Sequence, residues 1–452
     1  MAKYKAYPEY KDSGVEWLGD IPTHWDCTVL KRLCSLITGL TPPTQNEDNY
    51  ADEGYPWVRP EDLNESGFGT HASKYVSDIG WKLLRHIKPN STLICCIGTI
   101  GKCGYVKETV STNQQITAAT FRDCERFNYY LLQAARAQLE ELATGNVLKI
   151  LNSERLGALN VVKMNRKEAN TIAKFLDHET KKIDNLIEKQ QQLIELLKEK
   201  RQAVISHAVT KGLNPNVPMK DSGVEWVREV PEHWDVKKFK FACVGIIAGP
   251  FGSSITKDMY VNDGYKVYGQ EQVIPNDFNV GDYFISPEDF NRLSRYEVNA
   301  GDILISCVGT FGKIAVFPNW AKAGIINPRL IKATLSCRMN PFFVREFLKS
   351  TTVSKQFELL SRGGTMGVIN IAILNEIMIS IPPLEEQDSI FEFIYSQKKK
   401  FIDLVDLANS QINLLQERRT ALISAAVTGK IDVRDWVAPD TQSIEEPQEA
   451  TA

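Results

Sequence analysis

The sequence has no long apolar run, and this absence excludes several classes of protein. None of its hydrophobic stretches approaches the ~20 residues of a membrane-spanning helix. The segment Met1–Gly14 also lacks the apolar core of a secretory signal. We therefore expect a cytoplasmic protein that makes no membrane contact.

Metal and disulfide chemistry are poorly supported as well. The six histidines do not show the spacing of metal ligands. The nine cysteines are odd in number, and Cys95, Cys96 and Cys307 lie inside apolar, strand-like runs. Because adjacent cysteines chelate poorly, we expect reduced structural thiols, with no disulfide framework and no metal site.

Motifs of nucleic-acid enzymes are missing or out of context. Asn340-Pro341-Phe342-Phe343 is the nearest match to an adenine methyltransferase motif, but Asn followed by Pro also caps a helix. No strand–GxGxxG–helix cofactor unit accompanies it. The only Pro-Asp of the nuclease type, Pro439-Asp440, has no lysine after it. We expect neither catalytic nor cofactor-binding residues in this chain.

The overall charge is close to neutral. Because the net charge is −3, a nucleic-acid partner would have to meet local positive patches. Residues 432–452 contain six acidic residues and one arginine, with no hydrophobic period. This composition predicts an acidic, disordered tail.

The most informative positive feature is an internal repeat. Lys11–Trp25 returns as Lys220–Trp234 with 10 of 15 positions identical, and Leu197–Gly212 returns as Leu415–Lys430 with 9 of 16 identical. A period of roughly 210 residues is too long for a solenoid unit, so the chain is a duplicated domain-plus-helix module. Two similar surfaces suit duplex DNA, whose backbone has two-fold symmetry.

Two kinds of segment alternate along the chain. Short apolar runs broken by Gly, Pro, Asn and Asp predict mixed α/β globular domains, the first with a helical stretch at Asn128–Leu142. Long stretches without Gly or Pro predict helices. We predict an α+β protein in which two homologous globular domains are joined by two long helices. The expected parts are residues 1–160 (lead-in and first domain), 161–212 (first helix), 213–381 (lead-in and second domain), 382–431 (second helix) and 432–452 (tail).

Both helices carry a heptad pattern typical of a coiled coil. Asn165 followed by Glu168 predicts a capped start for the first helix. Gln190 and Gln411 are the polar positions expected to set the register. The predicted core positions are Ile183, Leu186, Ile187, Leu193, Ile194, Leu197 and Val204 in the first helix, and Phe401, Leu404, Val405, Ile412, Leu415 and Leu422 in the second.

An exposed helix of roughly 65 Å would be unstable alone, so we expect the two helices to pair. A two-fold relation between the modules makes the pair antiparallel, with pseudo-two-fold symmetry. The alternative is that each helix packs on its own globular domain. The phase of the repeat also predicts that the two ends of the chain lie close together.

Four segments together resemble the DNA-specificity subunit of type I restriction–modification systems. They are the Lys11–Trp25 lead-in, the ISCVGTFGK-type run at Ile305–Lys313, the IPPLEEQ start of a helix at Ile381–Gln387, and the KRQAVISHAVTKG end of a helix at Lys200–Gly212. The resemblance covers almost the whole chain except the acidic tail.

The resemblance implies a subunit with two target recognition domains spaced by an antiparallel coiled coil. It implies that this subunit reads a bipartite asymmetric double-stranded DNA site and performs no chemistry itself. Two modification (methyltransferase) subunits and two motor-nuclease (restriction) subunits are the implied partners. S-adenosylmethionine, ATP and Mg²⁺ are then expected on those partners, in DNA methylation and host defence.

Aligned loops of the two modules supply the candidate DNA contacts. Arg59 can fork onto guanine and Gln270 can pair with adenine in the major groove, whereas hydroxyls and lysines in turns suit phosphates. The candidates in the first module are Thr41, Arg59, Glu61, Thr99, Lys102, Asn113, Gln114, Gln115 and Lys149, and those in the second are Ser253, Ser254, Tyr268, Gln270, Glu271, Thr310, Lys313, Asn327, Arg329 and Arg362.

Simpler interpretations stay open for several candidates. The Gly-rich loops can be ordinary turns, Glu61 can brace an arginine, and the repeated tyrosine can belong to the core. The Gly-Thr-x-Gly-Lys runs lack the spacing of a nucleotide-binding loop. Half-sites read from one face of the duplex would be centred about one helical turn, ~34 Å, apart. Two other functions are a single-chain methyltransferase with an unrecognised active site and an adaptor without DNA contact.

Overall fold

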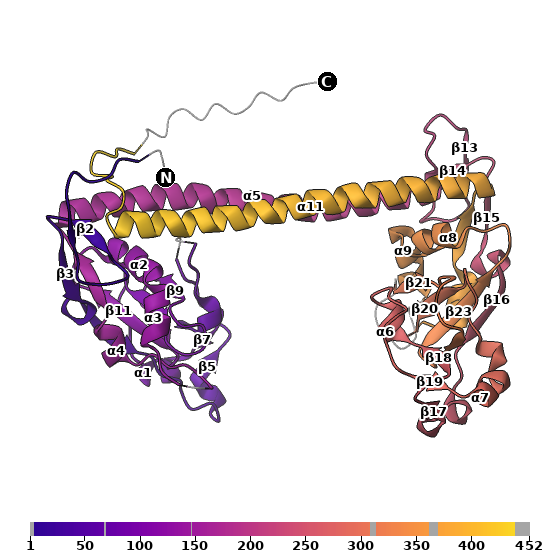
Figure 1. Ribbon diagram of the computed structural model, residues 1–452, viewed down its shortest axis with the longest axis horizontal. Coiled ribbons are helices and arrows are strands. Elements are labelled where there is room, and N and C mark those ends of the chain that lie inside the picture. The colour runs from indigo at the N-terminus through magenta and orange to yellow at the C-terminus, as the bar shows by residue number, and fades with distance from the viewer. Residues whose placement is uncertain (1–3, 67–68, 146, 308–312, 361–368, 439–452) are drawn as a thin grey trace. The chain divides into compact units, whose positions relative to one another are not determined.

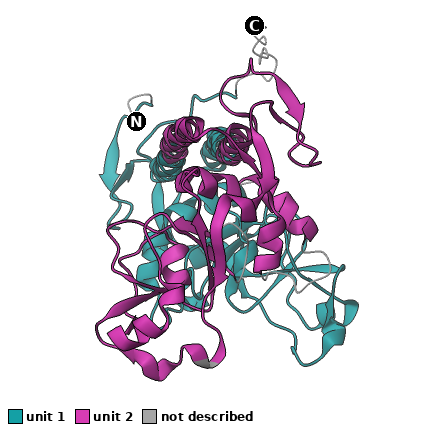
Figure 2. Cartoon of the chain, turned by 90° about the vertical axis from the view of Figure 1, so that its right-hand side faces the viewer, with its two compact units in different colours: residues 1–191, 409–452 teal, residues 192–408 magenta. Residues whose placement is uncertain are grey.

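The computed structural model describes residues 4–66, 69–145, 147–307, 313–360 and 369–438 (Figure 1). Contacts divide the chain into two compact units (Figure 2): unit 1 comprises Met1–Gln191 and Asn409–Ala452, and unit 2 comprises Gln192–Ala408. The sequence predicted the long helices as separate parts. The structure instead divides each of them between the two units, because each half of a helix packs on the globular domain beside it.

Unit 1 contains two four-stranded sheets and two two-stranded ones. The larger sheets have the orders β4-β11-β8-β9, which is antiparallel, and β10-β6-β7-β5, which is mixed. The pairs β1-β2 and β12-β3 complete it. The elements are β1 Tyr10–Asp12, β2 Asp20–Pro22, β3 Asp26–Val29, β4 Cys34–Thr38, β5 Tyr50–Ala51, β6 Tyr55–Val58, β7 Tyr75–Val76, α1 Asp78–Lys82, β8 Thr92–Cys95, β9 Cys103–Tyr105, β10 Ser111–Thr112, β11 Ile116–Phe121, α2 Glu125–Ala134, α3 Arg136–Leu142, α4 Ser153–Gly157 and β12 Asn160–Lys163.

Unit 2 repeats this topology strand for strand. Its large sheets have the orders β16-β23-β20-β21 and β17-β19-β18-β22, and its pairs are β13-β14 and β15-β24. The elements are β13 Met219–Asp221, β14 Glu229–Pro231, β15 Asp235–Lys238, β16 Cys243–Ala248, β17 Tyr260–Val261, β18 Tyr265–Tyr268, α6 Gln270–Val273, β19 Phe284–Ile285, α7 Pro287–Arg292, β20 Ile303–Ser306, β21 Ile314–Val316, β22 Gly324–Ile326, β23 Leu330–Leu335, α8 Pro341–Leu348, α9 Thr351–Leu360, α10 Ile371–Glu376 and β24 Met378–Ile381.

The local sequence explains these elements. Strands β8 and β20 are mostly apolar, with one buried hydroxyl residue each, because each lies between two neighbours and is buried along its whole length. Asn340 caps α8 as predicted, accepting hydrogen bonds from the amides of Phe342 (2.7 Å) and Phe343 (3.1 Å). The helical stretch predicted at Asn128–Leu142 is two helices, α2 and α3, because Ala135 leaves the helical conformation. The α+β class and the duplication are confirmed.

The long helices are α5, Arg166–Lys211, and α11, Leu384–Val427. The predicted cap of α5 is present, since Asn165 Oδ1 accepts from the amide of Glu168 at 2.9 Å. Gly212 and Gly429 follow the two helix ends with φ of +74° and +75°. This left-handed conformation suits glycine and terminates each helix.

A carboxylate in the first turn of each long helix, buried at Glu168 and 28% exposed at Glu386, holds the lead-in that precedes the globular domain. Glu168 Oε1 accepts hydrogen bonds from Trp25 Nε1 (3.0 Å) and Tyr7 Oη (2.9 Å), and Glu168 Oε2 lies 2.9 Å from His24 Nε2. In unit 2 the repeated His-Trp pair makes the same contacts, because His233 Nε2 and Trp234 Nε1 lie 2.9 and 3.0 Å from Glu386 Oε2. The lead-in repeats because it clamps the start of a helix.

Within each unit the two long helices run antiparallel. In unit 1 the start of α5 meets the end of α11, where Gly429 lies against Pro22 and Trp25. Further along the pair, Asp184 Oδ1 accepts from Arg419 Nε at 2.9 Å. In unit 2 the end of α5 at Gly212 lies against Trp234 and Glu386. The helices also pack on the globular domains, since one buried cluster joins α2, α5 and α11 in unit 1 and another joins α8, α5 and α11 in unit 2.

Burial separates the predicted core positions into three groups. Ile183, Ile194, Phe401 and Ile412 are buried, and Ile187, Leu197, Val204, Val405, Leu415 and Leu422 are half-buried. Three assignments were wrong: Leu186, Leu193 and Leu404 are 49%, 43% and 46% exposed. Gln411 is also exposed. A two-helix seam covers only a narrow stripe, and these positions lie beside it rather than in it.

The two ends of the described chain meet in unit 1, as the phase of the repeat predicted. The amide of Asp432 donates to the carbonyl of Lys5 at 2.7 Å, and Tyr10 Oη donates to the carbonyl of Gly429 at 3.0 Å. Tyr4 and Trp436 pack on the same ring, that of Phe175, at centroid distances of 5.4 and 5.7 Å.

A circular permutant should therefore fold. Joining Ala438 to Tyr4 by a short Gly/Ser linker and opening the chain at Asn214 should shift the melting temperature by only a few degrees, because no core contact is cut. Thermal denaturation measures this. The matched control opens the chain at Glu195 inside α5, which should abolish cooperative unfolding; equal damage in both permutants would refute the expected arrangement of the chain ends.

Candidate nucleic-acid interface

The loops that carry the candidate contacts converge in each unit through the same backbone hydrogen bonds. In unit 1 these bonds link the loop after β4, the loop before β11 and the segment that follows β8. The corresponding strands of unit 2 are β16, β23 and β20. In unit 1 the amide–carbonyl pairs are Gly39–Ile116 (3.0 Å), Asn113–Val58 (3.2 Å), Cys96–Gln115 (2.7 Å) and Leu151–Cys96 (2.9 Å). In unit 2 they are Gly249–Leu330 (2.9 Å), Asn327–Tyr268 (2.8 Å), Cys307–Arg329 (2.9 Å) and Ile369–Cys307 (2.9 Å).

Glycine permits the closest approach in this cluster of loops. A Cβ added at Gly39 would lie 2.2 Å from the carbonyl oxygen of Thr112, and one at Gly249 would lie 1.9 Å from that of Asn327. Both distances are far below contact, so these positions need glycine. Gly39 and Gly249 therefore have a packing role in their loops.

Asn113 and Asn327 shape the turn that follows. The Oδ1 atom of Asn113 accepts from the amide of Gln115 at 3.1 Å, and that of Asn327 accepts from the amide of Arg329 at 2.9 Å. Such side-chain-to-backbone bonds fix a turn. The two asparagines are common to both copies because they build the loop, and they leave Gln115 and Arg329 as the variable side chains.

The first-module candidates differ in how much of each side chain is available. Arg59 is half-buried and braced: its NH1 group lies 2.9 Å from Glu61 Oε1 and its NH2 group donates to Ser73 Oγ at 3.3 Å. Glu61 thus acts as the brace that was one of the two interpretations. Lys102 Nζ donates to the carbonyl of Pro60 at 3.1 Å, which ties its turn to the Arg59 loop.

The other first-module candidates lie at the rim of the same cluster. Thr41 Oγ1 donates to the Oε1 atom of Gln114, so the loop after β4 and the loop before β11 touch through side chains. Thr99 and Lys149 are exposed. Lys149 belongs to this group because Ile150 forms a bridge with Ile97, next to the Thr99 turn.

The second module requires one correction. Tyr268 was a candidate contact, but it is fully buried among Phe278 and Phe317, and its hydroxyl donates to the carbonyl of Lys322. Gln270 and Glu271 begin helix α6, and Gln270 Nε2 reaches Ser306 Oγ. Ser254, Glu271, Lys313 and Arg329 are exposed. The side chain of Ser253 and the residues Thr310 and Arg362 lie outside the described part of the structure.

Sequence reasoning missed Arg85. Its NH1 group donates to the carbonyl of Thr38 at 2.8 Å, directly before Gly39, and the side chain is otherwise exposed. Arg85 follows helix α1, far from the aligned loops in sequence, so only the fold brings it to them. The repeat contained a signal for this arginine, because Arg295 follows the end of α7 at the same distance as Arg85 follows the end of α1.

The cysteines behind the loops are not reactive groups. Burial raises the pKa of Cys96 and of Cys307 to about 11, so both remain protonated thiols at neutral pH. Among the described residues, no group of three or more His, Cys, Asp or Glu side chains is arranged to hold a metal ion.

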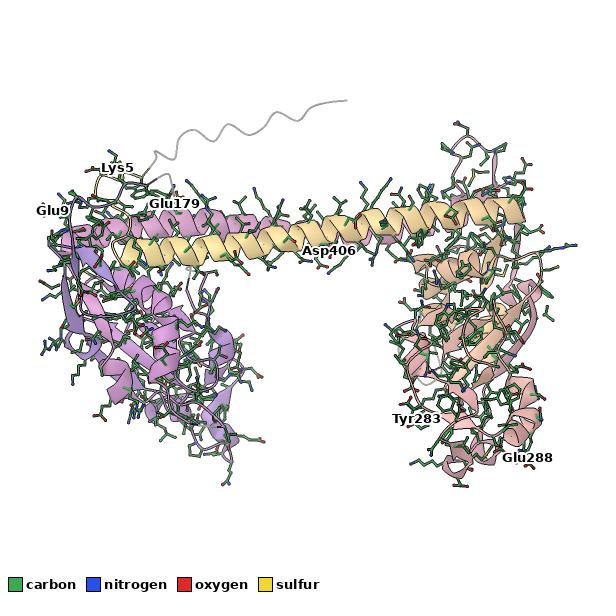
Figure 3. The ribbon with its side chains drawn as sticks, in the orientation of Figure 1. Lys5, Glu9, Glu179, Tyr283, Glu288 and Asp406 are labelled. Carbon is green, nitrogen blue, oxygen red and sulfur yellow. The ribbon has the colours of Figure 1, made fainter. Side chains whose placement is uncertain are left out.

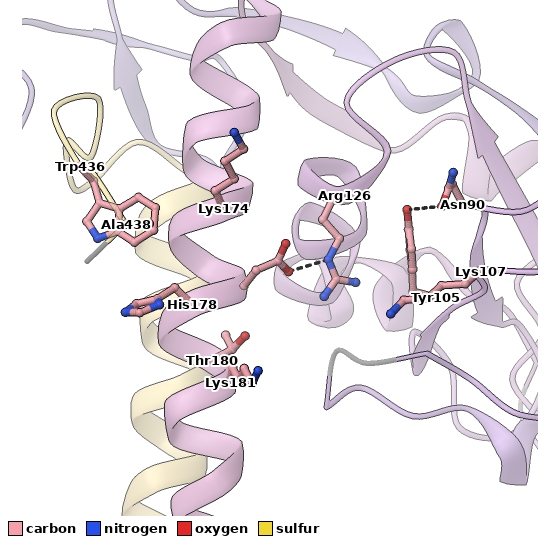
Figure 4. Close-up of a pocket in the computed structure, with 11 residues that line it drawn as sticks. Asn90, Tyr105, Lys107, Arg126, Lys174, His178, Thr180, Lys181, Trp436 and Ala438 are labelled. Carbon is pink, nitrogen blue, oxygen red and sulfur yellow. Dashed lines mark hydrogen bonds and ion pairs between the residues drawn. The ribbon is translucent and has the colours of Figure 1, made fainter. Parts of the chain in front are cut away.

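A separate cavity of about 780 Å³ lies in unit 1, at the opposite end of the β8–β9 hairpin from the Thr99 turn (Figure 4). Arg126 Nε donates to Asp177 Oδ1 at 2.6 Å in its wall, and Tyr105 Oη donates to Asn90 Oδ1 at 3.1 Å. Lys107, Lys174 and Lys181 add further positive charge. None of the loop candidates lines this cavity, so it is distinct from the candidate interface.

The fold and the loop clusters define a class: a duplicated recognition protein whose two domains share one loop framework and differ in the side chains that it displays.

No helix within the described residues has the length and hydropathy of a membrane span.

Comparisons with known proteins identify the family. A sequence profile described as type I restriction modification DNA specificity domain matches residues 22–196 and 251–416, more than half of the chain. The chain therefore belongs to this family, as a specificity subunit of a type I restriction–modification system and not as one of its enzymes.

Individual relatives are distant. The chain is 24% identical over 443 residues to the putative type I restriction enzyme MjaX specificity subunit of Methanocaldococcus jannaschii, covering 92% of this chain and 96% of that one. It is 27% identical over 154 residues to the type I restriction enzyme HindI specificity subunit of Haemophilus influenzae, covering 32% of this chain and only 33% of that relative.

Solved structures share the fold. One from a study of complex assembly and conformational transition of the type I R-M system has a TM-score of 0.66 at 14% identity, covering 90% of this chain and 98% of that one. The HsdS subunit from Thermoanaerobacter tengcongensis has a TM-score of 0.50 at 15% identity, covering 91% and 98%.

The geometry predicts different losses at two positions of unit 1. Lys149→Ala should weaken binding to all DNA sequences and reduce the salt slope by about 1, whereas Arg59→Ala should cost about 1–3 kcal/mol and relax one base position. Competition binding with single-base variants of the target at two salt concentrations measures both. Lys163→Ala, an exposed lysine on β12, is the control. A uniform loss for Arg59→Ala would assign Arg59 to a phosphate.

Proposed function

We propose that the chain reads a bipartite, asymmetric double-stranded DNA site, one half-site per recognition domain, through the major groove. The observation that supports this is the repeated loop framework. Its backbone bonds are the same in both units, while the residues that it carries differ: Arg329 takes the place of Gln115, and Gly269, which has no side chain, takes the place of Arg59. One framework with two sets of side chains is what reading two different half-sites requires.

The chemistry of the displayed side chains fits this role. Arg329 is exposed at the tip of its loop, and a guanidinium can donate two parallel hydrogen bonds to guanine. Arg59 is held by Glu61 and Ser73, so its guanidinium enters a groove with little loss of rotamer freedom. The exposed Lys149, Lys313 and Arg85 suit phosphates beside each reading position.

The long helices supply the surface for partner subunits. Several leucine and isoleucine side chains of the long helices are at least 43% exposed. They are Leu186 and Leu414 in unit 1, and Leu193, Leu196, Ile402, Leu404 and Leu407 in unit 2. They alternate with charged residues such as Asp406, which stands on the surface of α11 (Figure 3). Exposed apolar side chains on a charged helix pair mark an interaction surface. Two modification subunits and two motor-nuclease subunits are the proposed partners.

The remaining chemistry belongs to those partners. S-adenosylmethionine is proposed to bind the modification subunits, and ATP and Mg²⁺ the motor-nuclease subunits, so that adenine methylation and host defence by cleavage depend on the complex in the cytoplasm. This chain's contribution is to select the site and to hold the enzymes at it.

One experiment tests the whole proposal. Cells that carry the chain with its modification subunits should acquire methyladenine in a single bipartite motif, read by methylome sequencing. The purified chain alone, supplied with S-adenosylmethionine and the motif, should transfer no methyl group. Methylation by the chain alone, or a single contiguous motif, would overturn the proposal.

The proposal also predicts how the gap between half-sites is set. Inserting one heptad into α5 and one into α11 at the same level should lengthen the helices by ~10.5 Å and the gap by about three base pairs, without changing either half-site. Methylome sequencing reads the new motif. As a control, inserting three residues instead should disrupt the seam and abolish methylation. A longer helix pair with an unchanged gap would contradict the spacing role.

A further inference from the structure

Arg419 connects three elements of unit 1. It lies on α11, and its Nε donates to Asp184 Oδ1 on α5 at 2.9 Å. Its NH1 group donates to Gln133 Oε1 on α2 at 3.3 Å, and its NH2 group donates to the carbonyl of Glu65. Arg419 and Asp184 are each 12% exposed at the side chain, so this is a mostly buried ion pair. One guanidinium thus joins both long helices to the recognition domain.

Glu65 in turn holds the turn that carries Thr99 and Lys102. Its Oε1 atom accepts from the amide of Cys103, the residue after Lys102, at 3.0 Å. Its Oε2 atom lies 3.6 Å from the NH1 group of Arg136. Gly101 in the same turn has a φ of +78°, and a Cβ there would lie 2.9 Å from Cγ of Arg136. The turn is therefore seated on the Glu65–Arg136 pair.

We propose that Arg419 is a positioning residue, which couples the state of the helix pair to the position of the Thr99–Lys102 turn through Glu65. The inference rests on the proposed function, because it takes that turn to face the DNA backbone. Every link in the path is a direct contact, from Asp184 through Arg419 and Glu65 to Cys103.

The electrostatics explain why an arginine occupies this place. Burial raises the pKa of Asp184, and Arg419 acts in the opposite direction by favouring the carboxylate. Only arginine has enough donors in one plane to reach a carboxylate, an amide oxygen and a carbonyl together. A lysine would keep the charge and lose part of the bridge.

The path is reachable from the surface of the helix pair. A groove of about 370 Å³ is lined by Glu65, Gln133, Arg136, Glu140 and Arg419, together with Thr420 and Ile423 of α11. A protein docked on this part of α11 would lie next to the path. Docking on the helices would then change the position of the Thr99–Lys102 turn.

Unit 2 does not repeat the device. The sequence repeat aligns Arg201 with Arg419, but the shared helix-start carboxylates Glu168 and Glu386 align Asp184 with Ile402. An isoleucine cannot form the ion pair. The coupling is therefore specific to the first recognition domain, and Arg201 provides an internal control.

The test is a double-mutant cycle on the full chain assembled with its modification subunits and bound to its methylome-defined target. Lys102→Ala should reduce the salt slope of binding by about 1. Arg419→Ala should cause a similar reduction although it touches no DNA, and combining it with Lys102→Ala should add little. Arg418→Ala and Arg201→Ala should leave the slope unchanged, and Arg419→Lys should fall between wild type and Arg419→Ala. Full additivity of Arg419→Ala and Lys102→Ala would overturn the coupling.

Loss of a buried charge partner can destabilise the chain, so a second variant is needed. Asp184→Asn combined with Arg419→Met removes both charges and should retain the melting temperature while still losing the slope. Hydrogen exchange at the Cys103 amide gives a readout without DNA: exchange should accelerate in Arg419→Ala and in the double variant Asp184→Asn with Arg419→Met, and not in Arg418→Ala. Unchanged exchange would refute the link itself. Accelerated exchange with no effect of Lys102→Ala on binding would retain the link and reject only the DNA contact of that turn.

Discussion

The structure of each unit depends on a carboxylate in the first turn of a long helix. Glu168 and Glu386 accept hydrogen bonds from the Trp and His of a lead-in that lies far away in sequence. The carboxylate also suits the positive end of the helix dipole. At the same place the other long helix ends on a glycine that lies against the same tryptophan. The pair is Gly429 and Trp25 in unit 1, and Gly212 and Trp234 in unit 2. This contact joins the lead-in, the start of one long helix and the end of the other. Its presence in both units explains why the lead-in at Lys11–Trp25 and the helix end at Leu197–Gly212 are closely repeated in the second module.

The recognition domains follow a second constraint, which is the separation of framework from display. Asparagine side chains and close-packed glycines fix the loops, and both copies retain them because other residues would clash or leave the turn open. Side chains that point away from the framework are free to vary. This separation lets one fold present different donors and acceptors, which fits a family whose members select DNA sites. It also places the arginine and lysine candidates around the loops rather than within the sheets.

Much of this organisation could be read from the residues. The helix starts at Asn165 and Asn340 follow from capping chemistry, the duplication follows from repeated segments, and the pairing of loops between the modules agrees with the backbone bonds. The heptad pattern located the seam but included Leu186, Leu193 and Leu404, which are exposed. Periodicity reports that a face is apolar. It does not report whether a neighbouring helix or a partner subunit covers that face.

The sequence by itself determined the class of fold, the two modules, the capped helix starts at Asn165 and Asn340 and the loops that carry the candidate contacts, because these depend on local propensity and on repetition. The tertiary structure alone decided which side chains those loops display. Tyr268 is core rather than contact, Arg59 is braced by Glu61, and Arg85 joins the loops from the segment that follows α1. It alone also revealed the path from Asp184 and Arg419 to Glu65, whose members are separated by up to 354 residues. Burial and long-range hydrogen bonds depend on which chain segments meet, and no local pattern encodes that.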